Sequence, residues 1–487
     1  MIRLTLSEIA TAVSGTLAGA DPDTVVTGSV EHDSRKVTSG GLFLAFPGEK
    51  VDGHDFAEVA VAAGAVAVIG TRALDVPTII VEDPLVAVGA LASYVVRRLP
   101  DLAIIGVTGS SGKTTTKDFL AQLFDELGPT VAPPGSFNNE LGHPYTVLRA
   151  DADTRYLVLE YSTRGIGHID YLCQIAAPRI AVVLNVGTAH IGELGSVANI
   201  AVAKSELVRA LPPGVDSEAG EIGSVPAGGL AVLNADDPLV RAMAADTKAR
   251  VLLFGESADA DIRAFDITVD DRGRPAFTLA TPAGMAEVRL GVVGRHQVGN
   301  CLAVAAVGYA CGLSPRRLAE ILSGLRMASA RRMDVIERRD GVAVIDDSYN
   351  ANPSSMAAAL RALASMSAGR RGWAVLGYMA ELGDSELSGH LEVGRLVAEL
   401  GVDRLVVVGG EAAAIADGAE EISGWEGDAM RVSDQAAAIA ILADEIESGD
   451  VVLVKGSRYR TWQVADAMRD GEAVDAGVET VGEGGFA

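Results

Sequence analysis

Residues 102–116 read L-A-I-I-G-V-T-G-S-S-G-K-T-T-T, so an apolar run passes into a glycine-rich turn that ends in Lys-Thr. Glycines in such a turn adopt backbone angles closed to other residues, which lets successive N–H groups face phosphate oxygens while the lysine adds charge and the threonine a hydroxyl for a metal. The stretch therefore predicts a loop that binds a nucleoside triphosphate with Mg²⁺. The residues expected to bind it are Gly109, Ser110, Ser111, Gly112, Lys113, Thr114 and Thr115.

The loop is a variant of the strict pattern G-x-x-x-x-G-K-[ST]. Val107 stands where the first glycine belongs, and an extra glycine, Gly106, lies one place earlier. The alternative is a plain turn that links a strand to a helix. The apolar run before the turn and the helical pattern over 117–127 favour the phosphate loop.

Composition narrows the class of protein. A chain of 487 residues is long enough for about three domains, and 49% hydrophobic residues with 55 glycines fit a large α/β protein. A net charge of −25 argues against nonspecific binding to nucleic acid or to an anionic membrane. Cys173, Cys301 and Cys311 lack metal-ligand spacing, and the longest apolar run, 59–70, is too short to span a bilayer. We expect a cytoplasmic protein without membrane insertion, taken as a monomer.

Strand-like and helical runs divide the chain into three blocks. Residues 1–100 form a small α/β module, with a helix followed by a strand over 57–69. Residues 101–328 alternate strands and helices, which predicts a parallel sheet with helices on both faces, and residues 329–487 begin a second such series. The strands expected in the last two blocks are 156–160, 180–186, 231–234, 342–345, 373–376, 404–408 and 450–454. No G-x-G-x-x-G follows these strands in the right register, so a dinucleotide site is unsupported. Residues 211–229 are predicted to form an exposed loop and residues 474–487 an acidic tail.

Ligands of open α/β sheets bind beyond the carboxyl ends of the strands, where three polar residues stand out. Glu160 closes a strand and would hold Mg²⁺, although a lone strand-end Glu is also a common surface or capping residue. His190, in a glycine-bearing loop, is either a metal ligand or a hydrogen-bonded loop histidine. Lys204 lies on an otherwise apolar helix face, where a lysine that reaches out to solvent is the simpler interpretation.

Together these motifs resemble the Mur ligase family of ATP-dependent amide-bond-forming enzymes. They are T-G-S-S-G-K-T-T (108–115), Glu160, N-V-G-T-A-H-I-G-E-L-G-S (185–196), I-A-V-A-K-S-E (200–206), A-V-L-N-A-D-D-P (231–238) and I-D-D-S-Y-N-A-N-P-S-S-M (345–356). The likeness runs from about residue 34 to about residue 456. It implies an N-terminal substrate-binding domain (1–100), a central ATP-binding domain (101–328) and a C-terminal ligase domain with a Rossmann-like sheet (329–487).

The resemblance also implies roles for matching positions. Lys204 matches a carbamylated lysine, and a carbamate is an anionic oxygen ligand whereas an ammonium repels a metal. Arg332 matches a residue that reaches ATP, with Arg331 as its neighbouring alternative. The implied Mg²⁺ ligands are Thr114, Glu160, His190 and Lys204. The implied catalytic residues are Lys113, Lys204, His190, Arg332 and Asp347, with Asn300, Arg332 and Asp347 at the nucleotide and Ser34, Lys50, Asn138 and Asn139 at the substrate.

Within the family, the sequence N-A-N-P-S (350–354) lacks the arginine typical of the enzyme that adds the third residue of the peptide. Folylpolyglutamate synthetase begins close to its phosphate loop, whereas about 100 residues precede the loop here. The resemblance therefore implies that D-alanyl-D-alanine is joined to UDP-N-acetylmuramoyl-tripeptide in peptidoglycan synthesis. An ATP-hydrolysing switch protein that ligates nothing is the alternative from another class.

Departures from the family pattern lie near the expected pockets. Tyr161-Ser162 follows Glu160, Gln297 replaces the usual asparagine after His296, and Tyr378 stands where an acidic residue is common.

Overall fold

The computed structural model describes residues 1–48, 51–215, 222–457 and 461–469. Lys50 and the tail 474–487 therefore lie outside the described residues. Contacts within the chain define two compact units, and the N-terminal module and the central sheet fall in the same one. The first unit is Met1–Thr268, Pro275–Val292 and His296–Ser329, and the second is Val269–Arg274, Val293–Arg295 and Ala330–Ala487.

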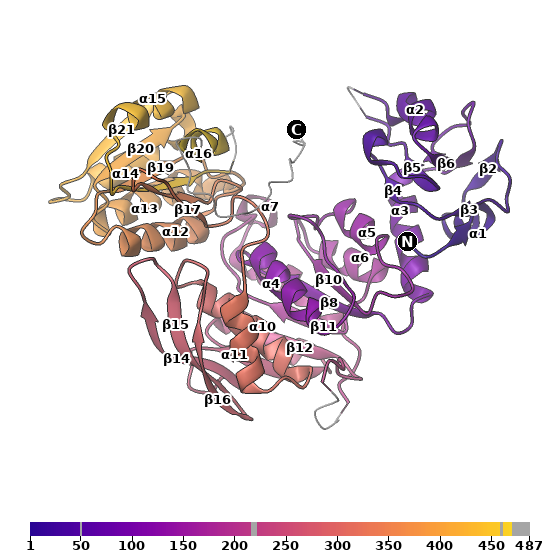
Figure 1. The fold of residues 1–487 in the computed structure, drawn as a ribbon, viewed down its shortest axis with the longest axis horizontal. Helices are drawn as coiled ribbons and strands as arrows, with labels where there is room; N and C mark the ends of the chain where they lie inside the picture. The colour runs from indigo at the N-terminus through magenta and orange to yellow at the C-terminus, as the bar shows by residue number, and fades with distance from the viewer. Residues whose placement is uncertain (49–50, 216–221, 458–460, 470–487) are drawn as a thin grey trace. The chain divides into compact units, whose positions relative to one another are not determined.

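The N-terminal part of the first unit is a small α/β module (Figure 1). Its elements are β1 (Leu4–Thr5), α1 (Leu6–Ala12), β2 (Thr16–Ala18), β3 (Val25–Val26), β4 (Val30–Glu31), η1 (Ser34–Lys36), β5 (Gly41–Leu44), η2 (Gly53–Phe56), α2 (Ala57–Ala62), β6 (Ala65–Gly70), β7 (Thr78–Ile80) and α3 (Pro84–Arg97). A five-stranded sheet has the order β2-β7-β6-β5-β4, and β1 pairs with β3. The predicted helix and strand over 57–69 are confirmed as α2 and β6.

A nine-stranded sheet with the order β16-β15-β14-β13-β12-β11-β8-β10-β9 forms the centre of the first unit. Its strands are β8 (Ala103–Thr108), β9 (Thr130–Val131), β10 (Tyr156–Glu160), β11 (Ile180–Val183), β12 (Leu230–Asn234), β13 (Arg250–Gly255), β14 (Ile262–Val269), β15 (Pro275–Thr281) and β16 (Gly284–Arg289). Its helices are α4 (Lys113–Asp125), α5 (Gly142–Val147), α6 (His168–Ile175), α7 (Ile191–Leu194), α8 (Val197–Arg209), α9 (Pro238–Ala242), η3 (Met243–Asp246), α10 (Gln297–Ala310) and α11 (Pro315–Gly324).

The predicted parallel sheet is confirmed from β9 through β14, where every pairing is parallel. Two expectations need correction. The antiparallel pair β15–β16 extends the sheet, and it gave no apolar run because β16 is mostly exposed. The strand expected over 180–186 ends at Val183, since the next residues turn into the phosphate-loop region. Residues 211–215 and 222–229 contain neither helix nor strand, as predicted for that loop.

Helices cover both faces of the central sheet, which confirms the predicted layering. Alternate strand residues point to opposite faces, so Ile105 and Val107 of β8 pack with α4, α10 and α11. Ile104 of the same strand packs with α3, α5 and α6 on the other face. The three cysteines are buried in these two cores, and burial raises the pKa of Cys311 to about 12. They pack as apolar groups.

The second unit has its own sheet, with the order β17-β18-β22-β19-β20-β21. Its elements are β17 (Asp334–Glu337), β18 (Ala343–Asp346), α12 (Pro353–Met366), β19 (Gly372–Leu376), η4 (Gly383–Ser385), α13 (Glu386–Glu399), β20 (Arg404–Val408), η5 (Gly410–Ala412), α14 (Ala414–Glu420), β21 (Asp428–Val432), α15 (Gln435–Glu445), β22 (Val451–Lys455) and α16 (Trp462–Arg469). The four predicted strands are the central ones and pair in parallel. Sequence reasoning missed β17 and β21, because edge strands that are partly exposed carry no apolar run.

No helix in the described part of the chain is long and apolar enough to cross a membrane.

The additional glycine before the phosphate loop has a packing reason. A Cβ at Gly106 would lie 2.8 Å from Cε2 of Tyr161, whose ring is fully buried beside β8. Tyr161 also donates a hydrogen bond from its hydroxyl to the carbonyl of Ala176. The missing side chain at Gly106 thus leaves room for the ring of Tyr161, so these two departures from the pattern belong to one packing contact.

Gly106→Ala is expected to lower stability, because the added methyl group overpacks a rigid ring. Overpacking of this kind costs about 1–3 kcal/mol, which corresponds to an apparent Tm lower by on the order of 2–6 °C in differential scanning fluorimetry. Gly324→Ala is the control, since its Cβ would meet nothing within 4 Å. Equal Tm values for the two variants would contradict the packing argument.

Candidate functional site

The phosphate loop links the carboxyl end of β8 to the start of α4. Gly112 precedes α4 with φ +80°, a left-handed conformation that favours glycine, and a Cβ there would lie 2.6 Å from Oδ1 of Asn300. Asn300 on α10 is therefore adjacent to the loop, as the resemblance implied. The Nζ of Lys113 donates to the carbonyl of Gly109 at 2.8 Å, so this lysine folds back over the loop.

Asn185, at the end of β11, is a loop-binding residue that sequence reasoning missed. Its Oδ1 accepts hydrogen bonds from the N–H groups of Ser110 (2.9 Å) and Ser111 (3.0 Å). The only signal available was its place at the head of the N-V-G-T-A-H motif. In this structure, the N–H groups of Ser110 and Ser111 are therefore engaged by Asn185.

Glu160 lies at the centre of a cluster of hydrogen-bond donors. Its side chain accepts hydrogen bonds from Thr114 Oγ1 (3.0 Å), Ser136 Oγ (3.2 Å) and Asn138 Nδ2 (2.6 Å). Glu160 is 1% exposed, so the interpretation as a surface residue is wrong. Ser136 was also missed, although it lies two residues before the predicted Asn138 in the segment S-F-N-N-E-L-G (136–142).

The donor set of this cluster fits Mg²⁺. A carboxylate and a threonine hydroxyl are hard oxygen ligands, and Mg²⁺ is usually held by one or two carboxylates together with substrate phosphates and water. Among the residues that the structure describes, no group of three or more His, Cys, Asp or Glu side chains is placed to hold a metal by itself. The pair Thr114 and Glu160 therefore suits a metal that arrives with a nucleotide.

Lys204 is buried on α8, with 2% of its surface exposed. The interpretation as a lysine that reaches solvent is therefore wrong. Burial lowers the pKa of its amine well below the usual value, and the charge of Lys113 lowers it further. Two residues on, Glu206 accepts hydrogen bonds from the N–H groups of Gly167 (2.6 Å) and Asp170 (3.0 Å) at the start of α6, which fixes α8 in place.

His190 begins the short helix α7 with φ +62°, in the loop that follows β11. Its Nδ1 lies 3.9 Å from Oε2 of Glu193. The same loop is tied to the phosphate loop, because the N–H of Gly187 donates to Ser110 Oγ at 2.8 Å. His190 is thus held at the same sheet edge as Lys113.

The residues expected at the substrate have varied surroundings. Ser34 is buried at the start of η1, and Asn139 accepts a hydrogen bond at 2.8 Å from the N–H of Gly142, the first residue of α5. Asn138 belongs to the Glu160 cluster. The hydroxyl of Tyr145 on α5 donates to Glu31 of β4 at 2.7 Å and so joins the N-terminal module to the central sheet.

In the second unit, Arg332 and Asp347 are held by neighbours of their own unit. The guanidinium carbon of Arg332 lies 4.1 Å from the ring centre of Tyr349. Asp347 accepts hydrogen bonds from Lys455 Nζ (2.5 Å) and from the N–H of Met333 (3.1 Å). Asp347 is therefore not a solvated strand-end carboxylate.

The residues next to Arg332 and Asp347 in the sequence have other partners. The NH1 of Arg331 lies 2.9 Å from Asp466, and its guanidinium stacks on Trp462. Asp346 is fully buried and accepts a hydrogen bond from Arg469 at 2.8 Å.

Two departures from the family pattern find partners in the structure. Gln297 is buried and accepts a hydrogen bond from Asn300 Nδ2 at 2.8 Å, so it orients the residue beside the loop. Tyr378 donates from its hydroxyl to Glu386 at 2.6 Å and stacks on His390.

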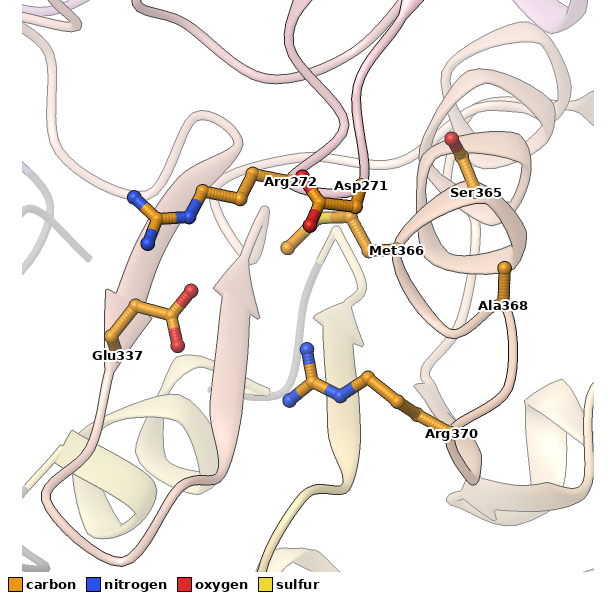
Figure 2. A pocket seen from close by; sticks show the side chains of 7 residues that line it. All are labelled: Asp271, Arg272, Glu337, Ser365, Met366, Ala368 and Arg370. Atoms are coloured by element: carbon orange, nitrogen blue, oxygen red, sulfur yellow. The ribbon is translucent and has the colours of Figure 1, made fainter.

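Figure 2 shows a pocket of the second unit that contains none of the predicted site residues. Two arginines and two carboxylates line it, and this mixture of charges does not favour a polyphosphate. The lining residues are Asp271, Arg272, Glu337, Ser365, Met366, Ala368 and Arg370.

Comparison with known proteins agrees with this geometry. Three family models match the chain: "Mur ligase family, catalytic domain" over residues 27–101, "Mur ligase middle domain" over 107–308 and "Mur ligase, glutamate ligase domain" over 331–458. The chain is 46% identical to UDP-N-acetylmuramoyl-tripeptide–D-alanyl-D-alanine ligase of Mycobacterium tuberculosis, over 96% of this chain and 98% of that protein. The chain belongs to the Mur ligase family. The ligase of the same name from Escherichia coli is 35% identical over 94% of this chain and 96% of that protein.

Solved structures of Mur ligases share the fold. A crystal structure of MurF from Acinetobacter baumannii matches with a TM-score of 0.83 and 32% identity, covering 96% of this chain and 99% of that one. MurF of Thermotoga maritima, solved in complex with ADP, matches with a TM-score of 0.75 and 29% identity over 92% and 98%. The predicted α/β class and family are thereby confirmed.

Lys113→Ala is expected to keep the fold and to reduce ATP turnover by a factor on the order of 100 or more. The reason is that the variant lacks the ammonium group that stabilises the negative charge developing on the transferring phosphoryl group. Steady-state phosphate release measures the turnover, and circular dichroism checks the fold. Lys248→Ala, at an exposed position outside the loop, is the control. Near-normal turnover of Lys113→Ala would contradict the nucleotide assignment.

Proposed function

We propose that this chain is an ATP-dependent ligase that joins D-alanyl-D-alanine to UDP-N-acetylmuramoyl-tripeptide, the last amino-acid addition of the cytoplasmic peptidoglycan precursor pathway. The proposal is supported by relatives of that name, which cover nearly the whole chain. The third residue of the peptide is diaminopimelate or lysine. The enzyme acts as a cytoplasmic monomer, with substrate, ATP and ligase functions divided over residues 1–100, 101–328 and 329–487.

One observation carries the proposal. The carboxyl ends of three adjacent strands place a phosphate loop, the buried pair Thr114–Glu160 and the loop of His190 at one edge of the central sheet. The buried Lys204 lies close enough to Lys113 for the charge of one to lower the pKa of the other. A hard metal site beside two lysines suits the transfer of a phosphoryl group to a carboxylate.

The chemistry has two steps. An oxygen of the terminal peptide carboxylate bonds to the γ-phosphorus of ATP and ADP leaves, which turns a poor electrophile into an acyl phosphate. The neutral amine of D-alanyl-D-alanine then attacks the acyl carbon, phosphate leaves with that oxygen, and the amine nitrogen loses a proton. Lys113 offsets charge on the transferring phosphoryl group in the first step.

Thr114 and Glu160 would hold one Mg²⁺, which supplies Lewis-acid stabilisation of the phosphate charge. Lys204 would act as a carbamate that places a second Mg²⁺ together with His190. Its lowered pKa supports this role, because only a neutral amine adds to carbon dioxide, forming an N–C bond and releasing a proton. The resulting anion would also relieve the repulsion between Lys204 and Lys113.

The remaining positions bind the two ends of the reaction. The residues proposed for the nucleotide are Gly109–Thr115, which form the phosphate loop, and Asn300 beside it, together with Arg332 and Asp347. Ser34, Lys50, Asn138 and Asn139 contact the UDP-muramoyl-peptide. The packing of Asn300 against Gly112 supports the first group.

A coupled assay tests the reaction. ATP turnover is measured with each substrate alone and with UDP-N-acetylmuramoyl-tripeptide and D-alanyl-D-alanine together, and the product is weighed by mass spectrometry. We expect turnover to require both substrates and the product to gain one dipeptide. Slow ATP hydrolysis that ignores both substrates, with no heavier product, would instead indicate a non-ligating switch protein.

Lys204→Ala is expected to lose most activity and to regain part of it with added formate or acetate, because the missing group is an anionic oxygen. Lys204→Arg is the matched control, since it keeps a cation that cannot form the carbamate, and it should stay inactive without the added anion. Activity is measured over a series of formate concentrations. Full activity of Lys204→Ala without formate would exclude the carbamate.

A further inference from the structure

We propose that Asn185 is a positioning residue that fixes the conformation of the phosphate loop. As a result, nucleotide phosphates bind at the N-terminus of α4 and not at the N–H groups of Ser110 and Ser111. The proposal rests on the nucleotide site of the proposed function. It adds a residue, at the end of β11, that shapes this site from outside the loop itself.

The contacts of Asn185 enclose the loop on two sides. Its Oδ1 accepts from the N–H groups of Ser110 and Ser111 at 2.9 and 3.0 Å, and its Nδ2 donates to the carbonyl of Ser111 at 3.2 Å. Its main-chain carbonyl also accepts from the N–H of Ser110 at 3.2 Å. One side chain thus fixes both the donors and the acceptor of a two-residue turn.

These hydrogen bonds determine which main-chain N–H groups are available to bind an anion. With the N–H groups of Ser110 and Ser111 engaged by Asn185, the donors directed at phosphate are those of the first turn of α4. The N-cap of this 13-residue helix is Gly112, which provides no side-chain cap. The first N–H groups of a helix have no intrahelical acceptor and carry the positive end of the helix dipole.

Asn185 also connects two parts of the site. It lies two residues beyond the end of β11, where the chain enters the His190 loop, and Ser110 accepts a hydrogen bond from Gly187 of that loop at 2.8 Å. The phosphate loop and the His190 loop are therefore held as one unit before a nucleotide binds. Preorganisation of this kind increases affinity, because the bound geometry need not be ordered at the moment of binding.

Calorimetry with ADP tests the proposal on the full chain, without peptide substrate. Asn185→Ala removes all side-chain bonds to the loop, and we expect ADP to bind about 10-fold more weakly. Asn185→Asp keeps the shape and both acceptor bonds but adds a negative charge near the phosphates and loses the donor to Ser111, so we expect a loss at least as large. The apparent Tm without nucleotide is measured in parallel.

Asn234→Ala is the matched control. Asn234 ends the adjacent strand β12, and its Nδ2 donates to the carbonyl of Leu184 at 2.8 Å, so its bonds lie outside the phosphate loop. We expect this variant to lower the Tm while its ADP affinity stays within twofold of the wild type. A merely structural Asn185 would behave in the same way, which would overturn the proposal.

The other outcomes are equally decisive. Tighter ADP binding by Asn185→Ala would show that Asn185 competes with phosphate for the Ser110 and Ser111 N–H groups, and the proposal would be wrong. If wild type and Asn234→Ala bind ADP but Asn185→Ala binds it equally well, the inference fails and the proposed function stands. Absence of ADP binding by the wild type would refute both.

Discussion

Lys113 and Lys204 share one edge of the central sheet, and the proximity of their charges is the constraint on which the site depends. Lys204 is buried, and the charge of Lys113 lowers its pKa further. Keeping both amines protonated therefore costs free energy. Under the proposed function such a site would be completed by anions, with a polyphosphate at Lys113 and a carbamate formed on Lys204. The surplus of acidic residues in the chain, with a net charge of −25, makes this local positive region the more specific.

Parallel pairing is what brings these groups together. In the register of the sheet, Glu160 lies beside Val107 of β8, and Val183 of β11 lies beside Thr108. The three strands therefore end level with one another, and whatever follows them must meet at the same edge. The Glu160 carboxylate, the phosphate loop and the His190 loop come from distant parts of the chain. The backbone register brings them to the same edge of the sheet.

Neutral amides make several of the contacts that hold the loops at this edge, together with the carboxylate of Asp237, which accepts a hydrogen bond from the N–H of Val186. Asn185 bonds to the phosphate loop and Asn138 bonds to Glu160, while Gln297 accepts a bond from Asn300. An amide orients a neighbour without adding charge, so the electrostatics of the site are left to the lysines, the carboxylate and the ligands. Buried charged contacts occur in both units, between Lys117 and Asp118 on α4 and between Lys455 and Asp347 in the second unit.

The sequence by itself determined the phosphate loop, the α/β class, the family, the strands β8, β10, β11 and β12 of the first sheet and the four central strands of the second sheet. Buried parallel strands are continuous apolar runs, and a loop that approaches phosphate needs glycines at fixed spacing, so both leave a local signal. Edge strands such as β16, β17 and β21 face solvent in part and carry no such signal.

Tertiary structure decided what the side chains at the strand ends do. The segment around Lys204 reads the same whether the amine reaches solvent or is buried, and only the packing of α8 against the sheet shows that it is buried. Likewise Asn185 and Ser136 acquire their roles from partners 74 and 24 residues away. Contacts of that range depend on strand order and register, which no local pattern of residues encodes.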